Sequence, residues 1–216
     1  MGAEIVTVDP VRPEPAFARC RDVIRAGGVI VYPTDTFYGL GADPRNPDAV
    51  KRLFEIKGRQ AGQPILLLLH DRGMVRDWAQ GITADAEALM DAFWPGPLTL
   101  VFTALPSVLQ NLTGGMGRIG LRVPGNEVTR RLLDALGAAL TGTSANRSGG
   151  PDLQTAQDVA AVLGKQVDLI LDAGRTPGGK VSSVVDVSAA GLTMVREGVV
   201  TEQELREAWY KFKKKA

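Results

Sequence analysis

Short apolar runs alternate along the chain with longer segments in which apolar residues recur at helical spacing. Such runs are typical of buried strands, and amphipathic segments are typical of helices packed on a sheet. The pattern predicts strands at residues 5–8, 29–32, 65–69, 98–103, 119–123, 139–141, 169–172, 183–187 and 193–196. It predicts helices at residues 15–26, 46–56, 84–93, 127–136, 155–163 and 201–211. This alternation indicates one α/β domain over residues 1–216, with a large, open, twisted and mixed sheet.

Composition and charge exclude several kinds of binding site and metal site. The chain has 25 Lys and Arg against 24 Asp and Glu, and its net charge of +1 gives no general attraction to nucleic acid or anionic membranes. One cysteine excludes an internal disulfide, and one histidine, His70, excludes a multi-histidine metal centre, so we expect no metal held by side chains alone. No apolar run is long enough for a signal peptide or a membrane span, which makes a cytoplasmic location the default expectation.

Two cations one residue apart follow the predicted helix 46–56. Lys57 carries a mobile ammonium, Arg59 carries a planar guanidinium, and Gly58 between them leaves room for a ligand's oxygens. This tripeptide fits a phosphate clamp, but it also fits a solvated turn at a helix C-terminus, where cations are favoured in any protein. In both cases we expect the two side chains to be partly solvated and outside the core.

Two loops that follow strands are rich in polar groups. Residues 33–41 combine hydroxyls, aromatic rings and glycines, which suits a binding loop or a rigid turn about equally. In residues 142–150, Ser144 and Asn146 would project together and could bind phosphate or ribose, although a turn that caps its own backbone fits as well. Arg122 lies in the predicted apolar strand 119–123, so we expect a buried anionic partner, either a protein carboxylate or a substrate carboxylate.

Residues 172–180 contain the G-x-x-x-x-G-K part of a phosphate-binding P-loop. Val181 follows Lys180 in place of the hydroxyl residue that ligates magnesium, and a predicted strand follows where a helix is required. We therefore reject a P-loop and interpret this segment as a flexible, glycine-rich loop near the site.

Six short motifs occur in order along residues 15–200: Pro33–Gly41, Lys57–Arg59, Phe93–Thr99, Arg122–Pro124, Ser144–Gly149 and Ser182–Asp186. Together they resemble the YrdC/TsaC family of L-threonylcarbamoyladenylate synthases. The resemblance implies a YrdC-like α/β fold, in which an open twisted sheet and its helices curl around a deep cavity. It also implies a nucleotidyltransferase that joins ATP, L-threonine and bicarbonate or CO2 into threonylcarbamoyl-AMP, with release of pyrophosphate, for the threonylcarbamoyladenosine modification of tRNA.

The resemblance also assigns roles to residues of this chain. The catalytic residues would be Lys57 and Arg59, which would hold the triphosphate with Mg2+ bound mainly through the phosphates. The partners would be ATP, L-threonine and, beyond them, tRNA or a downstream threonylcarbamoyl transferase complex, with no membrane. The ATP site would add Gly142, Ser144, Asn146 and Arg196, and the threonine site would consist of Thr36, Arg122 and Ser182, with Arg122 binding the carboxylate bidentately.

Some features depart from the family pattern or leave other functions open. Gln60 and Leu68 stand where many members have proline and histidine, Ser183 replaces a common threonine, and the chain resembles short members without an extra C-terminal domain. A paralogue with different carbamoyl-adenylate chemistry remains an alternative. A non-catalytic module that binds tRNA or double-stranded RNA is another, given the lysine-rich end, whose residues 212–216 we expect to form a frayed basic tail.

Overall fold

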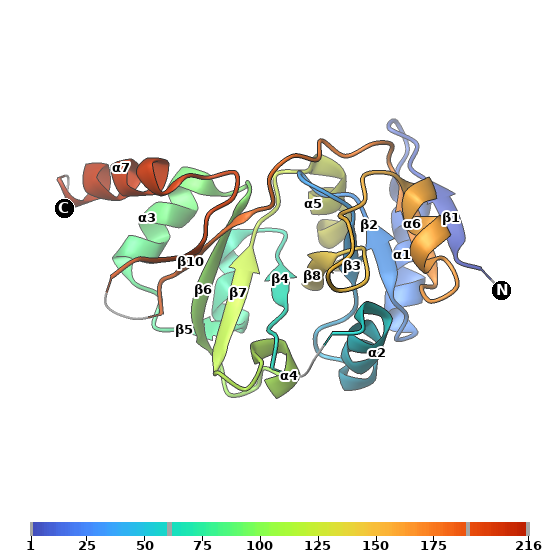
Figure 1. Ribbon diagram of the computed structural model, residues 1–216, viewed down its shortest axis with the longest axis horizontal. Coiled ribbons are helices and arrows are strands. Elements are labelled where there is room, and N and C mark those ends of the chain that lie inside the picture. The colour runs from blue at the N-terminus through green and yellow to red at the C-terminus, as the bar shows by residue number, and fades with distance from the viewer. Residues whose placement is uncertain (1, 60–61, 189–190, 215–216) are drawn as a thin grey trace.

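A computed structural model describes residues 2–59, 62–188 and 191–214 (Figure 1). In these ranges the chain forms one large mixed sheet with helices on both sides, as the alternating pattern predicts. The strands are β1 (Glu4–Thr7), β2 (Ile30–Tyr32), β3 (Gly39–Gly41), β4 (Leu66–Leu68), β5 (Ala79–Gln80), β6 (Leu98–Ala104), β7 (Arg118–Arg122), β8 (Leu140–Ser144), β9 (Leu169–Asp172), β10 (Ser183–Asp186) and β11 (Thr193–Arg196).

The sheet order is β1-β9-β2-β3-β8-β4-β7-β6-β10-β11, with β5 paired to β6. Parallel pairs join β1 to β9, β9 to β2, β4 to β7 and β6 to β10, and the other pairs are antiparallel. We call the strands from β1 to β8 the β1 side of the sheet, and those from β4 to β11 the β11 side. The two sides meet where β8 pairs with β4.

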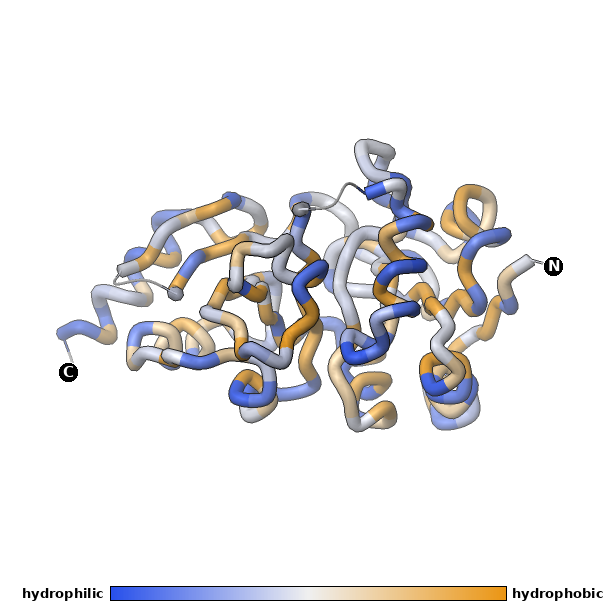
Figure 2. Tube along the Cα trace, turned by 90° about the horizontal axis from the view of Figure 1, so that it is seen from below, coloured by the Kyte–Doolittle hydropathy of each residue, from blue (hydrophilic) through white to orange (hydrophobic). Residues whose placement is uncertain are grey.

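The helices are α1 (Glu14–Arg25), α2 (Pro47–Lys57), α3 (Ala84–Phe93), α4 (Gln110–Thr113), α5 (Glu127–Leu136), α6 (Ala156–Leu163) and α7 (Glu202–Lys213), with a 3-10 turn at Arg72–Asp77. Many of them are amphipathic, so hydrophilic and hydrophobic colours alternate along the helices in Figure 2. Asn46 caps α2 by accepting from the amides of Asp48 and Ala49, as expected for an N-cap residue followed by proline.

Helices cover both faces of the β1 side. In β2, Val31 packs into one apolar cluster with α2 and α6, whereas Ile30 and Tyr32 pack into a second cluster with α1 and α5. Successive strand residues point to opposite faces, so a strand covered on both faces is apolar throughout. This explains the continuous apolar run at residues 29–32. Cys20 belongs to the second cluster and is fully buried.

On the β11 side, the strands β7, β6 and β10 are covered by helices on only one face. In β6, Leu98, Leu100 and Phe102 pack into the core with residues of α3 and α7, which lie at the C-terminal end of the molecule in Figure 1. The alternate residues Thr99 and Val101 line a cavity instead. The same alternation holds in β7 and β10, so the uncovered face of these three strands is the cavity floor.

Each predicted strand and helix is present, but the sequence pattern missed two strands and two short helical turns. β3 is the Gly-Leu-Gly segment of the loop 33–41, and a side chain at Gly41 would lie 2.6 Å from the ring of Tyr32. Glycine here permits the close approach of Tyr32 and weakens the apolar signal of a strand. β8 extends to Ser144, so the predicted turn begins later than expected. The prediction of a frayed tail at residues 212–216 was also wrong in part, because α7 continues through Lys213. Residues 215 and 216 lie outside the described ranges.

Candidate functional site

A cavity of about 620 Å³ lies over the uncovered face of the β11 side. Its walls come from the β2–β3 loop and β8 on one side, and from β6, β7, β10 and β11 on the other. It therefore lies where the two sides of the sheet meet. Seven of the nine predicted site residues line it: Thr36, Arg59, Arg122, Gly142, Ser144, Ser182 and Arg196.

Lys57 and Asn146, the other two, lie directly behind this wall. The Lys57 ammonium donates to the backbone carbonyl of Ser144 at 2.7 Å, to its hydroxyl at 3.2 Å and to Asn146 Oδ1 at 2.6 Å. Ser144 Oγ also donates to Asn146 Oδ1 at 2.7 Å, and Asn146 Nδ2 donates to Gly150 O and to Asp152 Oδ1. Lys57 thus forms one network with Ser144 and Asn146, which lie about 90 residues later in the sequence, and this network fixes Ser144 at the cavity surface.

The expectation that Lys57 is partly solvated was wrong, because the residue is only 3% exposed. It occupies the last turn of α2, on the apolar face that carries Leu53 and Ile56 into the core. Burial, and secondly the nearby positive charge of Arg59, lower the pKa of Lys57 to about 8, while Asp152 acts in the opposite direction. Lys57 is therefore protonated at neutral pH but close to titration.

Arg59 follows Gly58, the residue that ends α2 with a left-handed φ of 57°. It is half-buried, as expected, and lines the cavity. Its guanidinium donates to Thr143 Oγ1 at 3.2 Å and to the carbonyl of Pro64 at 2.7 Å, both neutral acceptors, and burial lowers its pKa. Gln60, the first of the departures from the family pattern, lies outside the described residues.

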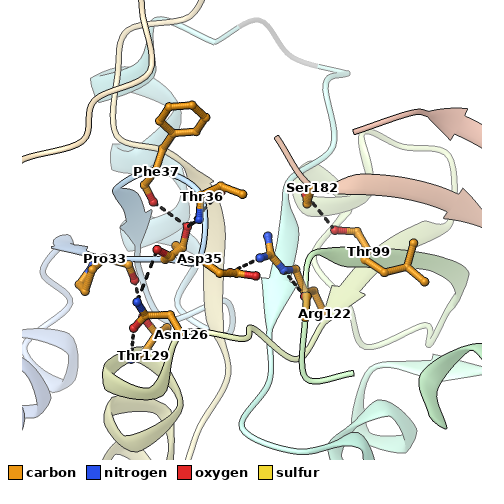
Figure 3. Close-up of polar contacts among 12 residues, drawn as sticks. Pro33, Asp35, Thr36, Phe37, Thr99, Arg122, Asn126, Thr129 and Ser182 are labelled. Carbon is orange, nitrogen blue, oxygen red and sulfur yellow. Dashed lines mark hydrogen bonds and ion pairs between the residues drawn. The ribbon is translucent and has the colours of Figure 1, made fainter. Parts of the chain in front are cut away.

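Arg122 stands at the end of β7, 4% exposed, and reaches the cavity (Figure 3). Its expected anionic partner is a protein carboxylate, since Nη2 is paired with Asp35, and Nε donates to the carbonyl of Gly96 at 2.9 Å. Asp35 is a residue that the sequence reasoning quoted within a motif but did not select. Leu68, the second departure, is the β4 partner of Arg122 in the sheet register and also lines the cavity.

Ser182 and Arg196 form a second group on the β11 side. Arg196 donates through Nε and Nη2 to the carbonyl of Ser182 and, at 3.3 Å, to its hydroxyl, which lies 3.5 Å from Thr99 Oγ1. Burial lowers the pKa of Arg196. Like Arg59, this guanidinium has only neutral hydrogen-bond acceptors among the described residues.

Thr36 and its loop are held by several hydrogen bonds. Thr34 Oγ1 accepts from the amide of Thr36 at 3.1 Å and donates to the carbonyl of Phe37 at 2.6 Å. The amide of Gly178 donates to Thr36 O at 2.7 Å, and that of Thr176 to Gln154 O at 2.9 Å. The glycine-rich segment 172–180 is therefore bonded to the cavity wall, and a strand, β10, follows it where a P-loop would need a helix.

Sequence reasoning also missed Asp152 and Arg118, which line the cavity. Arg118 is paired with Asp186, so two of the four cavity arginines, Arg118 and Arg122, already have a carboxylate partner. The strand period could have found Arg118, because it lies four residues before Arg122 and so on the same face of β7.

Within the described residues, no three acidic, histidine or cysteine side chains are grouped as a metal site would require. In the same part of the chain, no helix has the length and apolarity needed to cross a membrane.

Several known proteins are similar to this chain over most of its length. The family model for Sua5, YciO and YrdC, which carries the description "Telomere recombination", matches residues 22–198. The threonylcarbamoyl-AMP synthases of Pyrococcus abyssi and Bacillus subtilis are 35% and 32% identical over 85% and 89% of this chain. The chain spans only 54% and 56% of their lengths.

The crystal structure of Pyrococcus abyssi Sua5 complexed with L-threonine is similar over 94% of this chain and 60% of that one, with a TM-score of 0.91 and 33% identity. The residues matched by the family model, 22–198, include the whole cavity floor and the residues around Lys57, Arg122 and Ser144. On these grounds the chain belongs to the Sua5/YciO/YrdC family.

Proposed function

We propose that the chain is a threonylcarbamoyl-AMP synthase, which makes threonylcarbamoyl-AMP and pyrophosphate from ATP, L-threonine and bicarbonate or CO2. The observation that carries the proposal is that the arginines of one cavity differ in whether a protein carboxylate is paired with them. Among the described residues, Arg59 and Arg196 donate hydrogen bonds only to neutral acceptors and neither is paired with a carboxylate, whereas Arg122 is already paired with Asp35. A triphosphate suits the first two and a single carboxylate suits the third.

In this proposal the protein contributes positioning and charge, and no side chain acts as a nucleophile. The amine of threonine attacks CO2 and loses a proton, which gives a carbamate. A carbamate oxygen then attacks the α-phosphorus of ATP, the bond to the β-phosphate breaks, and pyrophosphate leaves. Arg59 would stabilise the departing pyrophosphate, and Lys57 would add its charge from behind Ser144. Because the substrates supply both nucleophiles, a histidine base is not required.

The remaining site residues divide between the two substrates. Ser144, held by Asn146, and the backbone at Gly142 would contact the nucleotide, and Arg196 would contact a phosphate. Thr36, Arg122 and Ser182 would hold L-threonine, and the L-threonine complex of the Pyrococcus relative supports an amino-acid site in this fold. Threonylcarbamoyl-AMP made here would then supply the threonylcarbamoyl group for tRNA modification, and the relatives from Pyrococcus abyssi and Bacillus subtilis are named threonylcarbamoyl-AMP synthases.

Magnesium fits this cavity only as a partner of the phosphates. Asp152 is the acidic side chain nearest the Lys57 network, and one of its oxygens accepts from Asn146 at 3.2 Å. Asp186, the other carboxylate on the cavity wall, is occupied by Arg118 and Ser188. Among the described residues that line the cavity, Asp152 would therefore be the carboxylate available to Mg2+, whose role would be to neutralise the triphosphate.

Pyrophosphate release from ATP, with and without L-threonine and bicarbonate, tests the proposal. We expect release only when all three substrates are present, and formation of threonylcarbamoyl-AMP in equal amount by mass spectrometry. The Arg59→Ala protein should lose at least about 100-fold in rate, on the scale found when one preorganised charge-stabilising donor is removed. Release that does not depend on threonine would contradict the proposal, and so would full activity of the Arg59→Ala protein.

A further inference from the structure

The guanidinium of Arg122 is held by the protein on one side and left open on the other. Its Nε donates to Gly96 O at 2.9 Å. Its Nη2 is paired with Asp35 (Figure 3). Nη1 makes no hydrogen bond to any residue that the structure describes, and Arg122 lines the cavity. The side of the fork formed by Nε and Nη2 is therefore occupied, which leaves Nη1 for a ligand.

Asp35 lies behind Arg122, away from the cavity. It is not among the residues that line the cavity, although its neighbours Thr34 and Thr36 are. Its second oxygen, Oδ2, is buried and has no hydrogen-bond partner among the described residues. A side chain at Gly125 would lie 3.3 Å from this oxygen, so Oδ2 points toward the backbone there. Arg122 is thus the partner through which Asp35 can act.

The backbone around Asp35 is fixed on both sides. Before it, Thr129 Oγ1 donates to Pro33 O, and Thr34 Oγ1 bonds to the amide of Thr36. After it, Gly178 donates to Thr36 O at 2.7 Å. Because the loop comes from the β1 side and Arg122 from the β11 side, the ion pair connects the two sides of the sheet.

We propose that Asp35 is a positioning residue that orients Arg122 toward the carboxylate of the amino-acid substrate. The inference rests on the proposed function and adds a residue to it. Asp35 neutralises part of the charge that would attract the substrate carboxylate, so its contribution is the direction of the guanidinium rather than a gain in positive charge.

Two substitutions separate direction from charge. Asp35→Asn removes the charge but keeps an acceptor at the position of Oδ1, so the threonine KM should change less than about threefold. Asp35→Glu keeps the charge but moves the carboxylate by one methylene, so the threonine KM should rise at least about tenfold, as for a lost charge-assisted contact. The ATP KM should stay within about threefold in both proteins, which a merely structural role would not predict.

Asp168→Asn is a matched control. Asp168 also forms an ion pair through two contacts, with Arg52 at 2.6 Å and 3.0 Å; this pair is more exposed than that of Asp35, and Asp168 does not line the cavity. The control should lower the melting temperature and leave both KM values unchanged. If the Asp35→Glu protein does not fold, Asp35→Ala replaces it with the same expected rise in threonine KM.

The test combines initial rates of pyrophosphate release with calorimetric titration of L-threonine into the full chain. A folded Asp35→Glu protein with an unchanged threonine KM would overturn the inference while leaving the proposed function standing. The same holds if both variants raise the threonine and ATP KM values equally. A wild-type chain that neither turns over nor binds L-threonine would overturn the proposed function and this inference together.

Discussion

Raising the pH should weaken nucleotide binding through Lys57. Its ammonium lies behind Ser144 with a pKa of about 8, so about 90% of the folded chains carry the charge at pH 7 and about 9% at pH 9. If the nucleotide binds only to the protonated form, the apparent Kd is the intrinsic Kd divided by the protonated fraction. The affinity for ATP should therefore fall by up to about tenfold over these two pH units.

Calorimetric titration with ATP, without threonine, measures this effect from pH 7 to 9. The range avoids the second ionisation of the terminal phosphate, which lies near pH 6. Omitting threonine avoids the titration of its own amine. The comparison is between the slopes of log Kd against pH in the wild type and in variants at position 57.

Two variants and one control make the result specific. Lys57→Arg keeps a charge that does not titrate in this range, and Lys57→Met has none, so both should give a flat profile, the Met protein with weaker binding throughout. Lys51 lies on the same helix with its side chain 75% exposed, and Lys51→Arg should keep the wild-type slope. A flat wild-type profile, or the same slope in the Lys57→Met protein, would refute the reasoning.

Three further outcomes are expected. Arg122→Ala should raise the threonine KM at least about tenfold and the ATP KM less than threefold, and equal rises in initial-rate measurements would contradict the assignment. Gly142→Ala should lower stability by about 1 to 3 kcal/mol in urea denaturation, because the new methyl would lie 2.5 Å from Leu66 Cδ1; an unchanged midpoint would mean that Leu66 moves freely. Between pH 8 and 10.5 the unfolded chain binds more protons at Lys57 than the folded chain does, so the free energy of unfolding of the wild type should rise with pH relative to that of Lys57→Met. Urea denaturation measures both, and parallel plots of this free energy against pH would exclude the linkage.

The fold was predictable because its signals are local. Strands such as Leu98–Ala104 and helices such as Ala84–Phe93 carry their period and boundaries in consecutive residues. β3 was missed because its stability comes from pairing with β2 and β8, while its own Gly-Leu-Gly sequence has a low strand preference. The mixed sheet was predicted from the alternation of strands and helices along the chain. The strand order depends on strand pairs that are distant in sequence, so it could not be read from the pattern.

The site was predictable as a set of residues but not as an arrangement. The position of Arg122 in an apolar strand correctly predicted an anionic partner. The sequence was compatible with either a protein carboxylate or a substrate carboxylate, and only the structure identifies Asp35. The same limit applies to Lys57, whose contacts are with residues about 90 positions later. A helix C-terminus is normally solvated, so local reasoning placed Lys57 in water and missed the strand end that covers it.

The burial of Lys57 is itself an argument for function. A pKa of about 8 in place of about 10.5 corresponds to a cost near 3 kcal/mol for keeping the charge in the folded protein at neutral pH. The hydrogen bonds to Ser144 and Asn146 satisfy the ammonium, but an apolar residue would follow Leu53 and Ile56 into the core without that cost. A costly cation placed directly behind a cavity that is also lined by Arg59 is what polyanion binding requires and what stability alone would not favour.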